Sequence, residues 1–132
     1  MAFITKSSAV SLDANSGQHA MYISELKAGE AITAGDLCYI DSNGVVKRAV
    51  NTNHTSTGSV VFTAGFAAKD TASGDAITLF GLGARFNYSS SMTPGVYLYS
   101  GSIAGSLVDA PYAEQDHPVA LVVSATDIVA IK

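Results

Sequence analysis

A short phrase that leads into a β-strand recurs three times along the chain. Each copy has a small residue or a proline, then glycine, and then a run rich in apolar residues, with the glycines at Gly35, Gly74 and Gly95. Glycine permits the tight turn that precedes such a strand, and the residues after it enter the sheet. The spacing of the copies is unequal, which excludes a solenoid. The phrase therefore predicts short strands separated by tight turns.

The apolar runs between turn signals predict most of the sheet. Hairpins are expected from 36–41 with 45–50 across Ser42-Asn43-Gly44, from 75–80 with 84–88 across Gly81-Leu82-Gly83, and from 119–123 with 128–131 across 124–127. Asn and Gly tolerate the positive φ that such turns need. Further strands are expected at 60–68, with a bend or bulge at Gly65, and at 96–100. Residues 18–28 fit a helix or a strand, and we favour the strand. The sequence thus predicts an all-β fold, a compact small β-barrel or sandwich of short antiparallel strands.

The length of 132 residues suits a single domain. Residues 1–19 are mostly small and polar, with a few scattered apolar side chains, and they predict an extended N-terminal arm outside the sheets. The single β-domain is expected at 20–132. The polar stretch 51–59 is expected to be an exposed loop.

Charged residues make up only 14% of the chain, against about 25% in an average soluble domain. Small residues take their place, so we expect a surface rich in Ser, Thr, Gly and Ala that other subunits cover. Acidic residues outnumber basic ones, 11 to 7, and the only basic cluster is Lys47-Arg48. Phosphate binding needs clustered cations, so nucleic acid is not an expected partner. The longest apolar run, 119–123, is too short to span a membrane.

The cysteine and histidine positions do not favour an enzyme. The lone Cys38 excludes an internal disulfide and lies in an apolar run, where a buried structural thiol is expected. Residues 1–6 lack the apolar stretch of a secretory signal, so we expect synthesis in a reducing cytosol. His19, His54 and His117 lack metal-ligand spacing, and the GxSxG motif is absent. We therefore expect no catalytic residues, no metal and no cofactor.

Tyr97 and Tyr99 alternate with Val96 and Leu98, which predicts two tyrosines on one face of a strand. Tyrosine is enriched in protein interfaces, so a subunit interface is one interpretation. Half-buried sheet packing and a sugar-binding platform are the alternatives, and the sequence leaves them open.

Several phrases follow one another in an order that resembles a known family. They lie at 27–41 (KAGEAITAGDLCYID), 43–46, 64–70, 73–79, 92–99 and 118–126. Each is a glycine turn followed by a strand or a closing strand, and their order resembles the small head-decoration, or capsid cement, proteins of tailed bacteriophages. The resemblance runs from about Lys27 to the C-terminus.

The resemblance implies a structural virion protein on the capsid exterior, made in the bacterial host cytoplasm. It would bridge subunits of the major capsid protein and self-associate as a homotrimer at three-fold and local three-fold positions. Some such proteins bind the capsid through an N-terminal arm, which points to the apolar residues of the arm here: Phe3, Ile4, Val10 and Leu12. The alternatives are a carbohydrate-binding or adhesin module of a phage fibre or tail tip, and an enzyme subunit whose site forms between chains.

Overall fold

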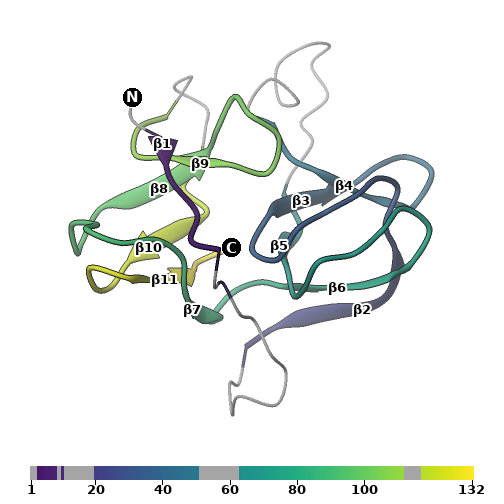
Figure 1. Ribbon diagram of the computed structural model, residues 1–132, viewed down its shortest axis with the longest axis horizontal. Coiled ribbons are helices and arrows are strands. Elements are labelled where there is room, and N and C mark those ends of the chain that lie inside the picture. The colour runs from purple at the N-terminus through teal and green to yellow at the C-terminus, as the bar shows by residue number, and fades with distance from the viewer. Residues whose placement is uncertain (1–2, 9, 11–19, 51–62, 112–116) are drawn as a thin grey trace.

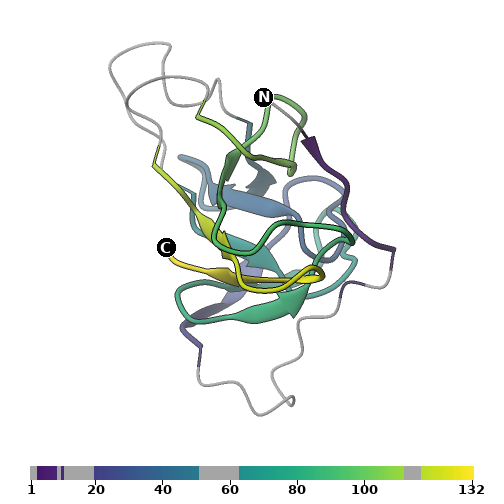
Figure 2. The same ribbon diagram turned by 90° about the vertical axis from the view of Figure 1, so that its left-hand side faces the viewer.

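The computed structural model describes residues 3–8, 10, 20–50, 63–111 and 117–132. These residues form two antiparallel sheets and no helix, so the all-β prediction is confirmed. The sheets stand side by side in Figure 1, and Figure 2 turns the left-hand one toward the viewer. Neither sheet closes into a barrel, and the arrangement is sandwich-like.

The larger sheet has six strands and carries both the N-terminal strand and the C-terminal strands. Its order is β1 (Phe3–Ile4), β9 (Leu107–Val108), β8 (Tyr97–Ser100), β10 (Ala120–Val122), β11 (Asp127–Ala130) and β7 (Arg85–Asn87). The smaller sheet has the order β2 (Tyr22–Lys27), β6 (Ala76–Phe80), β5 (Gly65–Ala67), β3 (Leu37–Ile40) and β4 (Val46–Arg48).

The main hydrophobic core joins the two sheets. Phe66 of β5 meets Phe86 of β7 edge-on, with ring centroids 5.2 Å apart, and Phe86 in turn contacts Tyr88. Leu98 and Ile128 of the six-stranded sheet are fully buried in the same cluster. Burial of such large side chains contributes about 1.5–3 kcal/mol each and holds the sheets together.

A second, smaller core lies on the other face of the five-stranded sheet. Cys38 and Ala67 belong to it, whereas Leu37 and Phe66 beside them in the strands belong to the main core. A single parallel bridge from Ala28 to Val46 brings the end of β2 against β4 and curls the sheet around this cluster. The inner strands β3 and β5 have neighbours on both faces, so they read as apolar runs without alternation, whereas β2 at the edge of the sheet is largely exposed.

Two of the three expected hairpins are confirmed, and one is wrong. β3 pairs with β4, and β10 pairs with β11. β6 and β7, by contrast, lie in different sheets. The turn between them is shared: the Gly81 amide donates to the Met21 carbonyl at the end of the five-stranded sheet, and the Gly83 amide donates to the Ala130 carbonyl of the six-stranded sheet. The turn therefore carries the chain from one sheet to the other.

The remaining strands match the sequence with local adjustments. Residues 22–27 form strand β2, as favoured, with a bulge between Ile23 and Leu26 where Glu25 takes a φ of 62°. β5 begins at Gly65, whose φ is 150°. β8 confirms the strand expected at 96–100. The expected loop 51–59 lies outside the described residues.

The expected arm departs from the prediction at its start. Phe3 and Ile4 pair with Val108 and Leu107 of β9, so they are a strand of the six-stranded sheet and not a segment outside it. The reason is long-range: the exposed edge of β9 supplies backbone partners that no local sequence pattern reveals.

Candidate functional site

The N-terminal segment crosses from one sheet to the other and is held at several points. After β1, the Ser7 amide donates to the Tyr88 carbonyl at 2.5 Å, just beyond β7. The Lys6 ammonium forms an ion pair with the Asp36 carboxylate and donates to the Thr33 hydroxyl at 2.8 Å. The second carboxylate oxygen of Asp36 accepts the Thr33 amide at 2.9 Å. The segment is therefore docked on its own domain.

The four apolar residues expected to contact a capsid have different positions. Phe3 is 48% exposed, whereas Ile4 and Val10 are partly buried and pack against the main core. Leu12 lies outside the described residues. Phe3 is thus the one of the three described residues whose side chain can meet a partner without a rearrangement of the segment.

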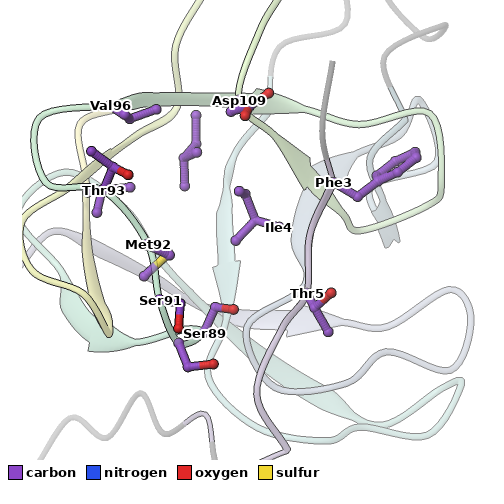
Figure 3. Close-up of a pocket in the computed structure, with 12 residues that line it drawn as sticks. Phe3, Ile4, Thr5, Ser89, Ser91, Met92, Thr93, Val96 and Asp109 are labelled. Atoms are coloured by element: carbon purple, nitrogen blue, oxygen red, sulfur yellow. The ribbon is translucent and has the colours of Figure 1, made fainter.

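A pocket of about 390 Å³ opens between the two edges of the six-stranded sheet. β1 forms one edge of this sheet and β7 forms the other. The hydrogen bond from the Ser7 amide to the Tyr88 carbonyl joins the segment that follows β1 to the segment that follows β7. Between them, β1 faces the 89–93 segment that follows β7, and we call this opening the seam pocket (Figure 3). Its lining comprises Phe3, Ile4, Thr5, Ser89, Ser90, Ser91, Met92, Thr93, Val96, Leu98, Asp109 and Val122.

The seam pocket combines an apolar interior with a polar rim. Leu98, Val122 and Met92 are buried core residues. The rim carries five hydroxyl side chains, at Thr5, Ser89, Ser90, Ser91 and Thr93, and one carboxylate, Asp109. Its size lies within the range of small-ligand sites. The lining holds no histidine, cysteine or lysine.

Sequence reasoning missed the seam pocket because its walls come from distant parts of the chain. Ile4 and Met92 are separated by most of the domain, and their proximity depends on the pairing of β1 with β9. The only local signal is the run of three serines at 89–91.

Tyr97 and Tyr99 share the outer face of β8, as the alternation predicts, because Leu98 between them points into the core. Tyr97 is 49% exposed and lies opposite Leu121 of β10. Tyr99 is half-buried and lies opposite Val108 of β9. The structure places neither tyrosine in the seam pocket, and their role as a subunit interface stays a prediction.

The buried titratable groups are structural. Cys38 is fully buried, as expected, and its thiol donates to the Asp36 carbonyl at 3.3 Å. Burial raises the pKa of this thiol far above its usual range, and the negative charge of Asp36 adds to the shift. Burial likewise raises the pKa of Tyr88, again with a smaller contribution from Asp36. A thiol with such a pKa is unreactive at neutral pH.

The histidines do not form a site within the described part of the chain. His117 is exposed, and His19 and His54 lie outside the described residues. Among the residues that are described, no three His, Cys, Asp or Glu side chains come together as metal ligands would. The described residues also include no helix long and apolar enough to cross a membrane.

An exposed apolar patch at the edge of the five-stranded sheet was not predicted. Met21, Tyr22 and Ile23 at the start of β2 are 66%, 60% and 42% exposed, and Leu82 beside them is 51% exposed. They border a small apolar hollow that reaches Leu79 of the second core. We call these four residues the edge patch. The sequence does not predict this patch, because the expected hairpin across Gly81-Leu82-Gly83 does not place Leu82 beside the start of β2.

Comparison with protein-family models finds no matching family, and no curated protein matches the chain.

Proposed function

We propose that this protein is a capsid decoration protein of a tailed bacteriophage, which binds the outer surface of the capsid and bridges subunits of the major capsid protein. The observation that carries the proposal is the ordered set of turn-and-strand phrases. Three of these phrases contain a glycine with positive φ, namely Gly35 (82°), Gly74 (90°) and Gly95 (90°). Each of these glycines lies two residues before the first residue of a strand, which is β3, β6 or β8 respectively. The phrases on which the resemblance rests are therefore structural units of the fold.

Two properties of the surface support a protein that is bound to other subunits when it functions. Soluble monomers rarely expose contiguous apolar patches larger than a few hundred Å², and exposed apolar patches of that kind mark interaction sites. The edge patch gathers Met21, Tyr22, Ile23 and Leu82 at one end of the five-stranded sheet. The low charge content suits the same role, since charged side chains in an interface need desolvation and matched partners.

The proposed assembly follows the resemblance. The chain is made in the host cytoplasm, assembles as a homotrimer and sits on the capsid exterior at three-fold and local three-fold positions. Phe3 and the N-terminal segment contact the capsid, and Tyr97 and Tyr99 contact a neighbouring subunit. Many copies on one shell add up to strong attachment even when each contact is weak.

Co-sedimentation with isolated heads tests the proposal. Heads of the encoding phage that lack this protein are mixed with the purified chain and pelleted, and we expect saturable binding. Phe3→Ser is expected to weaken binding by about tenfold, because it removes an exposed aromatic anchor. Ile103→Ser, at another exposed apolar residue, is the matched control. A chain that stays in the supernatant at every concentration would overturn the proposal.

A carbohydrate-binding or adhesin module is the second candidate, and the half-exposed ring of Tyr97 favours it. A ring on an open sheet face can stack on a sugar. A glycan array separates the two candidates: specific glycan signals that disappear in Tyr97→Ala would support the module. The absence of signals leaves decoration as the better account.

A further inference from the structure

We propose that the seam pocket binds an extended peptide segment of a partner protein, which adds as a strand to the outer edge of β1. This inference goes beyond capsid decoration, because it needs only a peptide of suitable sequence and not a capsid. It is carried by three features of the pocket: a strand edge with which no described residue pairs, an opposite wall of polar groups, and an apolar interior between them.

The first feature is the outer edge of β1. β1 pairs with β9 on one side and ends the strand order of its sheet. In an antiparallel ladder, neighbouring residues direct their backbone N–H and C=O groups to opposite sides. One of Phe3 and Ile4 therefore directs its groups away from β9. Within the described residues, no segment other than β9 forms a backbone hydrogen bond with Phe3, Ile4 or Thr5. An incoming strand can meet these groups by β-augmentation.

The second feature is the wall across the pocket. Ser91 takes a φ of 59°, unusual for a residue other than glycine, and Met92 donates its amide to the Ala125 carbonyl. Among the described residues, the hydroxyls of Ser90, Ser91 and Thr93 have no hydrogen-bond partner, and neither do the amides of Ser90 and Ser91. These groups can accept and donate hydrogen bonds to the second side of an inserted peptide backbone.

The third feature is the apolar interior of the pocket, which determines the side chains that a bound peptide would carry. Figure 3 shows Ile4 reaching from β1 toward the side of the pocket that holds Met92 and Thr93. The aliphatic interior suits an apolar side chain of the peptide. Asp109, the one charged residue of the lining, is exposed at the rim and favours a basic side chain there.

A sugar fits the same pocket less well. Phe3 is the only aromatic residue of the lining, and its ring points away from the other labelled lining residues in Figure 3. The pocket therefore offers no ring face on which a sugar could stack.

Selection from a phage-displayed library of random dodecapeptides on the full-length chain tests the inference. We expect enriched peptides with alternating apolar residues and a Lys or Arg. Ser90→Trp, which places an indole in the pocket, should weaken the binding of these peptides by about tenfold or more. Ser73→Trp, at an exposed turn serine outside the pocket, is the matched control and should leave it unchanged. Thr93→Trp serves as a second blocking variant where Ser90→Trp melts below the control.

Two further measurements address the mode of binding. Bound peptide should slow amide hydrogen exchange in residues 3–5, because strand addition protects the edge of β1. Asp109→Asn should remove the preference for a basic residue. The inference is overturned by a selection without enriched peptides, by peptides that bind both blocking variants as well as the control, or by unchanged exchange at 3–5 under saturation. A glycan-array signal that Ser90→Trp abolishes would assign the pocket to a sugar. None of these outcomes depends on binding to heads, so they are distinguishable from failure of the proposed function.

Discussion

At the scale of single residues, Asp36 connects three parts of the molecule. Its side chain is nearly buried, and its two oxygens accept hydrogen bonds from Lys6 and Thr33. Its Cβ and Cγ pack against Gly105, where an added Cβ would lie 2.9 Å from Cγ. The carboxylate thus fixes the N-terminal segment, the start of β3 and the loop before β9 relative to one another.

Removal of the ammonium partner should be costly. Lys6→Met leaves the Asp36 carboxylate buried with one hydrogen bond lost, and we expect a decrease of about 2 kcal/mol in the free energy of unfolding, reduced from larger values because Lys6 is partly exposed. Lys69→Met, at an exposed lysine, should change it by less than about 0.5 kcal/mol. Urea denaturation measures both, and equal effects would show that the ion pair contributes nothing.

The buried thiol predicts how stability depends on pH. The pKa of Cys38 is higher in the folded state than in the unfolded state, so above about pH 8.5 the unfolded chain loses a proton that the folded chain keeps. The contribution of the protonated Cys38 thiol to the free energy of unfolding is therefore complete below that pH. Above it, the free energy of unfolding decreases by up to about 1.4 kcal/mol per pH unit. Tyr88 should add a second decrease above about pH 10 for the same reason.

Denaturation curves between neutral and alkaline pH check this dependence. Cys38→Ala should flatten the first decrease, and Tyr88→Phe should flatten the second. A wild-type curve that stays level through this range, or one that Cys38→Ala leaves unchanged, contradicts the burial of an unreactive thiol.

At the scale of the elements, glycine positions differ in what they require. An added Cβ at Gly65 would lie 2.6 Å from the Phe80 carbonyl oxygen, in the neighbouring strand β6, whereas at Gly44 it would meet nothing within 4 Å. Both have positive φ, 150° and 80°. Of these two glycines, only Gly65 lies where two strands approach closely.

Alanine substitutions at Gly44 and Gly65 separate the cost of the backbone conformation from the cost of a steric clash between strands. Gly44→Ala should cost about 1 kcal/mol, because only the backbone conformation is disfavoured. Gly65→Ala should cost about 3 kcal/mol or more, because β5 must also move away from β6. Thermal and chemical denaturation of the two variants measure the difference. Equal losses would mean that β5 and β6 do not approach closely at this point.

The elements also show what the sequence can reveal. The β3–β4 and β10–β11 hairpins were predictable because their turns and their pairing are local. The hairpin predicted across Gly81-Leu82-Gly83 is wrong for a long-range reason, because each end of this turn forms a hydrogen bond with a different sheet. The seam pocket was unpredictable for the same reason: β1 and the 89–93 segment meet only once both sheets exist.

At the scale of the whole molecule, the apolar surface is uneven. The edge patch lies at the start of β2 and the crossing between sheets, whereas the half-exposed rings of Tyr97 and Phe3 lie on the outer face of the six-stranded sheet, where Leu121 and Tyr99 are more buried. This distribution suits a molecule with more than one contact surface, as a protein between capsid subunits and its own copies needs.

A substitution in the edge patch should separate folding from binding. Leu82→Ser is expected to change the free energy of unfolding by less than about 0.5 kcal/mol, because the side chain is half exposed, and to weaken binding to heads by about tenfold. The same denaturation and pelleting assays apply. Unchanged binding by Leu82→Ser would remove the edge patch from the proposed interface.

The most direct test of the capsid role is the composition of purified particles. Quantitative mass spectrometry of purified virions of the encoding phage should find this chain in a fixed ratio to the major capsid protein. A membrane-impermeant amine reagent should label it on intact particles. Absence of the chain from the particles, or labelling only after the capsid is opened, would contradict a decoration protein on the capsid exterior.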